Sequence, residues 1–186
     1  MIYDLPTSLE VGGVMREIRT DYRAALDLCV ALSDPELSNE DKVYALIGIF
    51  YPDWEEIHPR HYQEATNKCI WFLNGGSDEE PTRKAPKLMD WEQDFQLIVS
   101  PINRVIGREI REPKPLHWWT FLSAYYEIGD CLFSQVVRIR DKKAKGKPLD
   151  KEEKEWYKNH RDMVDIKTVY TQAEQDLLAQ FSKKGG

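Results

Sequence analysis

The sequence has few cysteines and no long hydrophobic run. Its 186 residues include only three cysteines, Cys29, Cys69 and Cys131, with no CxxC pair among them. Scattered thiols in odd number, each beside apolar neighbours, indicate reduced, buried side chains instead of a disulfide framework. The sequence also lacks an apolar run of membrane-spanning length and the basic, then apolar, start of a signal peptide. We therefore expect a protein of the cytoplasm without a membrane partner.

The signatures of common enzyme sites are missing as well. The chain has no GxSxG nucleophile turn, no phosphate-binding P-loop and no GxGxxG dinucleotide fingerprint. Asp90, Glu92 and Asp94 form an acidic cluster, but carboxylates are favoured at the start of a helix for electrostatic reasons alone. His58 and His61 have the spacing of a metal-binding pair without an evident third ligand. The sequence thus predicts no enzyme activity, no metal site and no cofactor.

Positive charge is in deficit overall. The chain carries 26 Lys and Arg residues against 32 Asp and Glu residues, so its net charge is −6, which disfavours nucleic acid as a partner because phosphate binding needs a positive face. Residues 138–147 are the exception, with six cations and one acid. Cations are favourable near the end of a helix, so a solvated helix end explains the cluster. Docking of an acidic protein onto Arg138, Arg140, Lys142 and Lys143 is the second interpretation.

What the sequence does contain is helical periodicity. Apolar residues recur at spacings of three and four in most of the chain, a pattern typical of amphipathic helices. The predicted helices cover residues 21–32, 38–51, 59–74, 90–106, 116–128, 131–143, 150–164 and 166–181. Pro101 cannot donate a backbone hydrogen bond, so we expect a kink or break near Ser100. Thr20 should cap the first helix, and three pairs have the spacing of capping boxes: Ser38 with Asp41, Asp90 with Gln93, and Asp150 with Glu153.

The N-terminal stretch differs from the rest. Two short β-type runs, residues 9–11 and 14–18, flank Gly12 and Gly13, and a two-residue glycine turn of this kind is typical of a hairpin. An isolated hairpin is only marginally stable, so it must lie on the helical body or pair with another strand. We expect a mainly α protein: a compact helical domain of about seven to nine helices with a small N-terminal β-hairpin.

Residues 116–128 are the most apolar of the predicted helices. Pro115 suits a first helical turn, and Gly129 suits a left-handed C-cap. The segment is apolar over most of its circumference, so we expect other helices to pack against it on several sides. Trp118 and Trp119 then belong to the core; an aromatic groove for a partner is the alternative interpretation.

The composition changes after residue 146. The stretch 150–164 carries many more charged than apolar side chains, whereas 166–181 has one apolar face. We expect residues 1–146 to form the helical domain, with the hairpin in residues 1–19. Residues 147–186 should form a peripheral helical arm that ends in a flexible tail.

Several stretches of the chain stand out together. They are residues 4–8 with 10–13, 34–38, 50–52, 88–94, 116–119 with Phe121, and 133–140. In this order they resemble a family from long-tailed bacteriophages that is labelled phage gene-product fifteen, and they cover about residues 1–145. Thr120, where that family has a basic residue, and Pro101 depart from its pattern.

The resemblance implies a role in tail morphogenesis. Genes of that family lie between those of the major tail protein and the tape-measure protein, and the products are regarded as non-enzymatic tail assembly chaperones. The implied partners are the tape-measure protein and the major tail (tube) protein, with self-association as a further option. Such a chaperone acts in the host cell cytoplasm and is absent from or scarce in the mature virion. A structural tail or head–tail component retained in the virion is the alternative, and a nucleic-acid-binding regulator would depend on residues 138–147 alone.

The resemblance also implies a testable feature of the gene. Related chaperones are often made in two forms, the longer through a −1 ribosomal frameshift, and Ser182-Lys183-Lys184 permits a slippery heptanucleotide if the serine codon ends in A and AAA then AAA or AAG follow. A frayed, polar chain end is the simpler explanation of these residues. We expect a slippery run at codons 182–184 and two products on a blot with an antibody against the N-terminal domain. A gene without that run and a single band near 21.8 kDa would contradict the expectation.

Overall fold

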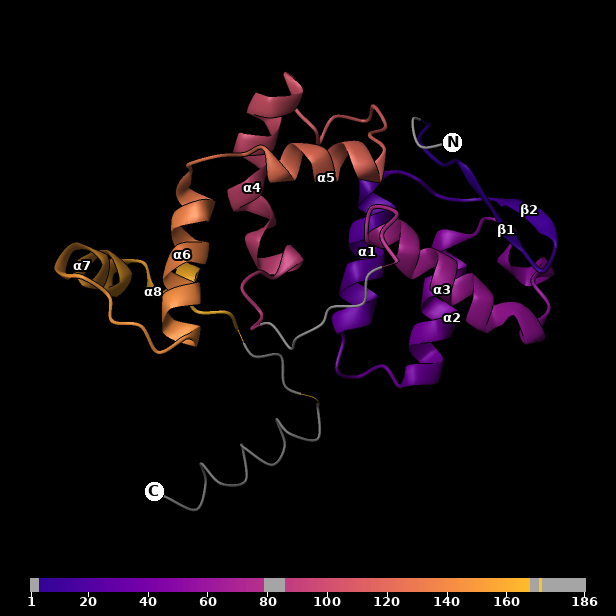
Figure 1. The fold of residues 1–186 in the computed structure, drawn as a ribbon, viewed down its shortest axis with the longest axis horizontal. Coiled ribbons are helices and arrows are strands. Elements are labelled where there is room, and N and C mark those ends of the chain that lie inside the picture. Colours follow the sequence, from indigo (N-terminus) through magenta and orange to yellow (C-terminus); the bar gives the residue numbers. More distant parts are fainter. Residues whose placement is uncertain (1–3, 79–85, 168–170, 172–186) are drawn as a thin grey trace, which may run out of the picture.

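The chain folds mainly into α-helices, with one small hairpin near its N-terminus. A computed structural model describes residues 4–78, 86–167 and 171 (Figure 1). These residues contain eight α-helices, two 3-10 turns and one two-stranded antiparallel sheet. The elements are β1 (Ser8–Val11), β2 (Val14–Glu17), α1 (Tyr22–Ser33), α2 (Asn39–Phe50), η1 (Trp54–Glu56), η2 (Pro59–His61), α3 (Tyr62–Leu73), α4 (Trp91–Ile106), α5 (Trp118–Tyr126), α6 (Leu132–Ala144), α7 (Lys151–Asn159) and α8 (Arg161–Val164). The predicted mainly α class is confirmed.

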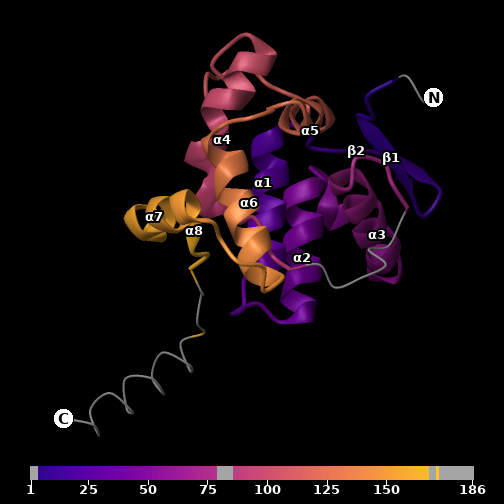
Figure 2. The ribbon, with the colours of Figure 1, turned by 60° about the vertical axis from the view of Figure 1, so that its left-hand side comes forward.

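Helix α1 connects the two halves of the helical body. It contacts α2 on one side and α4 and α5 on another. Helix α3 and the hairpin lie beyond α2, whereas α6 and α8 continue the body beyond α4 (Figure 1, Figure 2). Most buried side chains of this body belong to one core cluster, which extends from β1 to the start of α6.

The hairpin is confirmed, and the structure shows how it is held. Gly12 and Gly13 have φ angles of +62° and +79°, the left-handed conformations that a type I′ turn requires. The Gly12 N–H donates to the Glu64 carboxylate of α3 at 3.0 Å, and the Arg16 guanidinium pairs with Asp53 beside η1. The hairpin therefore lies on the helical body, fixed by polar contacts to α3 and to the turn after α2.

Helix α5 begins later than the sequence predicts. The expected start after Pro115 is wrong, because the chain there forms an antiparallel bridge in which His117 pairs with Asp21. In this bridge the Leu116 carbonyl accepts the Tyr22 N–H at 2.9 Å. These backbone groups are used across the bridge, so the helix starts only at the residue after it.

The aromatic residues of α5 form much of the core. Trp118 is 1% exposed, and its indole Nε1 donates to the Leu73 carbonyl at 3.0 Å. Its ring stacks on Phe121, which stacks in turn on Tyr22 of α1 with ring centroids 4.8 Å apart. Tyr126, in the last turn of this helix, is 76% exposed, whereas Ile128 just after it is 8% exposed. The core interpretation is thus right for Trp118 and Ile128 and wrong for Tyr126.

Apart from α5, and from α3, which begins only after the 3-10 turn η2, the predicted helix starts are confirmed within a residue, and two predicted caps are corrected. Capping boxes form at Ser38 with Asp41 and at Asp150 with Glu153. Thr20 does not cap α1, because Asp21 accepts the capping hydrogen bond instead. Asp90 caps α4, but its own N–H donates to Asp94 and not to Gln93. The Gln93 side chain is used elsewhere, as described below.

Helix α4 runs through Pro101 without a break, so a break near Ser100 is excluded, whereas a kink there stays a prediction. Pro101 is itself buried, and Ile98 and Ile102 on either side of it belong to the core. Burying large aliphatic side chains contributes about 1.5–3 kcal/mol each, enough to offset the roughly 3 kcal/mol that proline costs inside a helix. The predicted run 166–181 lies almost entirely outside the described residues.

Helices α7 and α8 cover a smaller cluster outside the main core. Val136 and Ile139 of α6 and Val164 of α8 are its buried side chains. Every residue of α7 is exposed or half-buried. Such an arrangement suits a peripheral arm after residue 146, and the domain boundary itself stays a prediction.

Substitution of Trp118 tests the core. Trp118→Ala leaves a large cavity and removes the partner of the Leu73 carbonyl, so we expect a loss of about 3–5 kcal/mol in the free energy of unfolding. Tyr126→Ala, on the exposed end of the same helix, should change it by less than about 0.5 kcal/mol. Urea unfolding followed by tryptophan fluorescence measures both. Equal stability of Trp118→Ala and the unmodified protein would contradict the core assignment.

Candidate partner-binding site

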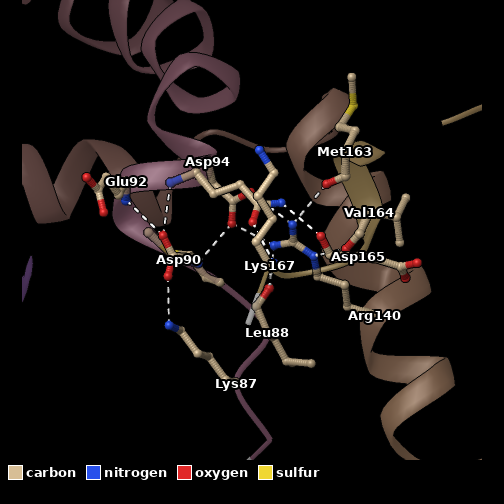
Figure 3. Close-up of polar contacts among 12 residues, drawn as sticks. Lys87, Leu88, Asp90, Glu92, Asp94, Arg140, Met163, Val164, Asp165 and Lys167 are labelled. Atoms are coloured by element: carbon tan, nitrogen blue, oxygen red, sulfur yellow. Dashed lines mark hydrogen bonds and ion pairs between the residues drawn. The ribbon is translucent and has the colours of Figure 1, made fainter. Parts of the chain in front are cut away.

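A buried ion pair joins α4 to α6. Asp94 and Arg140 have side chains that are 0% and 5% exposed. Two parallel hydrogen bonds join them, Nη1 to Oδ2 at 2.6 Å and Nη2 to Oδ1 at 3.0 Å (Figure 3). Planar, two-pronged pairing of this kind is the strongest contact that arginine makes with a carboxylate.

The remaining donors of Arg140 bind backbone carbonyls. Nε donates to Val164 O at 2.6 Å, Nη2 to Met163 O at 3.0 Å and Nη1 to Leu88 O at 3.0 Å. Together with the two bonds to Asp94, these contacts use all five N–H groups of the guanidinium. A charge can be buried at tolerable cost only when it is paired and fully hydrogen-bonded. Arg140 therefore ties α6 to α4, to the chain before α4 and to the end of α8.

Residues 163–167, here called the strap, are also held by Gln93 of α4. The Gln93 amide donates to Asp165 O at 3.0 Å and accepts the Lys167 N–H at 3.0 Å, as a neighbouring β-strand would. The Val164 side chain is fully buried between these contacts. Side chains of α4 and α6 thus bind three carbonyls and one N–H of the strap, which is recognition of its main chain.

Charged groups secure the side chain of Asp165 in the strap. Lys143 and Tyr157 donate to its carboxylate, and Arg161 donates at 3.3 Å. Partial burial disfavours ionisation of Asp165, but the hydrogen bonds from Lys143 and Tyr157 outweigh it and hold the pKa of Asp165 below its ordinary value. Partial burial likewise opposes the charge of Lys143, and the bond to Asp165 outweighs it and raises the pKa of Lys143. Both groups are therefore ionised at neutral pH.

A surface hollow of about 590 Å³ opens beside the strap. Its walls come from the end of α1, the start of α4 and the end of the strap, with Val30, Pro35 and Ile166 as apolar lining and Asp34, Lys87, Asp90, Glu92 and Lys167 as charged lining. Burial opposes the charge of Asp90, but the Gln93 N–H and Lys87 outweigh it and lower the pKa of Asp90. A mixed lining of this kind suits the side chains of a protein partner.

Two features are absent from the described residues: a cluster of metal ligands and a membrane-spanning helix. Within residues 4–78 and 86–167, no three His, Cys, Asp or Glu side chains gather as metal ligands. Over the same ranges, no helix is both long and apolar enough to cross a bilayer. His58 instead caps η2 through a hydrogen bond from the Arg60 N–H, and His61 lies 3.4 Å from the Glu64 carboxylate.

Comparison with known proteins identifies the family. A sequence model described as Bacteriophage Gp15 protein matches residues 1–166. The chain belongs to this family. No curated protein and no solved structure matches the chain. As a member of the Gp15 family, it is a phage structural or morphogenesis protein from a family that is not known for enzymes.

The structure separates the residues that the sequence of this Gp15 family member suggests for partner binding. Trp118 lies in the core, and Trp119 is half-buried with its Nε1 donating to Phe72 O at 2.9 Å. Arg140 lies inside the protein, so it can affect a partner only by shaping the surface. Lys143 pairs with Asp165 of the strap. Partner binding by these residues stays a prediction.

Arg138 and Lys142, the other two cations predicted to bind a partner, are also paired within the chain. Arg138 pairs with Asp130 at 3.4 Å, and Lys142 with Glu153 of α7 at 2.5 Å. Both side chains are at least partly exposed, but each is already bound to one of these acids.

Sequence reasoning missed the roles of Asp94 and Gln93. It assigned Asp94 to a helix start, and Gln93 to a capping box. One signal was present: Arg140 continues the apolar stripe of Phe133, Val136 and Val137 at helical spacing. A cation on a buried stripe calls for a buried acid, but no spacing in the sequence indicates which one.

Loss of the Arg140 guanidinium should weaken the whole junction. Arg140→Met leaves Asp94 buried without its countercharge and the strap carbonyls without donors, so we expect a loss of about 3–5 kcal/mol in the free energy of unfolding. Lys145→Met is the control, because Lys145, the residue after α6, pairs with Asp141 on the surface of that helix and such pairs contribute about 0–1 kcal/mol. Urea unfolding measures both variants. Similar losses would show that the buried network does not stabilise the fold.

Proposed function

We propose that the protein is a non-enzymatic tail assembly chaperone that binds the phage tape-measure protein and helps recruit tail-tube subunits. The observation that carries the proposal is membership of the bacteriophage Gp15 family over residues 1–166. The family consists of phage structural or morphogenesis proteins, and this chain has none of the common catalytic motifs. Both observations favour an assembly role over an enzymatic one.

Physical chemistry supports this role. A tape-measure protein is a very long helix with apolar faces, and bare apolar surface of that length aggregates. Many acidic copies bound along one target would keep the complex dispersed, and this chain carries a net charge of −6. Chaperone molecules would cover the apolar faces in the host cell cytoplasm until tube subunits replace them.

The hollow beside the strap is the surface we assign to the tape-measure protein. It is large enough to take side chains from one face of a helix, and Val30, Pro35 and Ile166 supply apolar contact at its walls. Asp34 and Lys87 in its lining suit the charged flanks of an amphipathic helix. The half-buried Trp119 lies on α5, away from this hollow, and is the second candidate surface.

The charges of the basic stretch favour a protein partner over nucleic acid. Five of the six cations in residues 138–147 form ion pairs with acids of the same chain. An ion-paired lysine releases fewer counterions from a phosphate backbone than a free one, so this stretch gives little basis for DNA or RNA binding.

Co-expression tests the chaperone role. We expect the soluble fraction of the tape-measure protein to rise several-fold when this chain is present, and a pull-down to recover both. Val30→Glu, in the hollow, should abolish the gain, while Val105→Glu on the exposed end of α4 should keep it. Equal tape-measure solubility with and without the unmodified chain would exclude the function; equal behaviour of the two variants would exclude only the hollow.

The alternative is a structural tail or head–tail component that remains in the virion. Mass spectrometry of purified virions separates the two. A chaperone should be absent or present in far fewer copies than the tube protein, whereas a structural component should appear at a fixed ratio to it.

A further inference from the structure

The site at which Gln93 of α4 and Arg140 of α6 bind the strap, here called the α4–α6 cleft, holds the strap mainly through its backbone. Arg140 binds the carbonyls of Met163 and Val164 (Figure 3), Gln93 binds one further carbonyl and one N–H of the strap, and the Val164 side chain is buried. Two of these carbonyls end helix α8 and the third follows it, so the site binds the end of a helix and the chain that leaves it. Here the ligand is a later segment of the same chain.

The arm that carries the strap is joined to α6 by an open connection. Helix α6 ends at Ala144 and α7 begins at Lys151. Between them Gly146 has a φ of +64°, and a Cβ built on it would meet no atom of the described chain within 4 Å. Pro148 follows, and residues 144–148 are all exposed. Leu149 is the one residue of the connection that packs on the smaller cluster, so a change of direction at residues 144–148 would disturb few packed side chains.

The apolar contacts of the arm are distinct from the main core. Its buried side chain Val164 belongs to the smaller cluster with Val136 and Ile139, not to the cluster that contains Trp118. Separating the arm from α6 would expose this smaller cluster and remove two acceptors of Arg140, so the site requires a strap, from its own chain or from another copy.

Two charge pairs direct the arm onto α6. Lys142 pairs with Glu153 of α7, and Lys143 pairs with Asp165 of the strap. In both pairs the cation lies on the body and the acid on the arm. The basic stretch of α6 thus complements the acids of any arm that carries this sequence.

From these observations we propose that the α4–α6 cleft is a docking site for the strap of a second copy, so that two chains exchange their arms. The segment that fits the cleft best is the one already in it, and every copy carries that segment. Exchange re-forms each hydrogen bond and ion pair of the closed chain, so only the connection at residues 145–150 and the association itself change the free energy. This self-association does not depend on the proposed chaperone function.

Cross-linking between two variants, each with one introduced cysteine, tests the exchange. Lys142→Cys places a thiol on α6, and Glu153→Cys places one on α7, where the two native side chains touch at 2.5 Å. Cys131→Ser removes the half-buried native thiol at the start of α6. Cys29 and Cys69 can stay, because burial raises the pKa of Cys29 to about 11 and raises that of Cys69 as well, which suppresses their reactive thiolates.

The two variants are co-expressed, purified together through a tag on one of them, and treated with a short bismaleimide. Arm exchange predicts a cross-linked species of twice the chain mass that contains both variants. A single chain carrying both substitutions is the control, because it must cross-link if the two sites lie as the fold places them. A cross-link in this control without any in the mixture would overturn the proposal.

The connection between α6 and α7 provides a second test. Deletion of Lys147 and Pro148 shortens the path back to the chain's own cleft, so the dimer fraction in size-exclusion chromatography with light scattering should rise several-fold. A five-residue Gly/Ser insertion after Gly146 relaxes that path and should lower the dimer fraction. A dimer fraction that is the same in both variants would also overturn arm exchange, whatever the outcome with the tape-measure protein.

Discussion

The complete hydrogen bonding of one buried cation constrains the C-terminal half of this fold. Arg140 can stay ionised inside the protein only if every one of its donors finds an acceptor, since an unpaired buried charge would cost several kcal/mol. Asp94 supplies two acceptors, and the carbonyls of Leu88, Met163 and Val164 supply the rest. The positions of α4, α6, the chain before α4 and the strap are therefore mutually dependent, although they are far apart in sequence.

The same junction links the two proposals for this Gp15 family member. The family match ends at residue 166, within the strap, so it includes the elements that meet at Arg140. The strap forms one wall of the hollow assigned to the tape-measure protein, through Ile166 and Lys167. A change in which chain supplies the strap would leave that wall in place, because exchange re-forms the same contacts. Self-association and partner binding at this site are thus compatible.

Local sequence signals predicted the structure correctly where a residue type strongly favours one backbone conformation. The Gly12-Gly13 turn is such a case, because both residues adopt positive φ angles that other residues avoid. Local signals failed where several partners were equally close. The Asp90 N–H could donate to the side chain of Gln93 or of Asp94. It donates to Asp94, because the Gln93 side chain is bound to the strap.

The sequence by itself determined the mainly α class, the hairpin, most helix boundaries, the burial of Trp118 and the likeness to a phage family. Periodicity and capping chemistry act over a few residues and can therefore be read along the chain. Only the tertiary structure decided that Arg140 leaves the basic cluster to pair with Asp94, 46 residues earlier. The reason is that charge pairing depends on distance in space. Apolar packing brings α4 and α6 together, and no spacing in the sequence indicates which acid and which cation then meet.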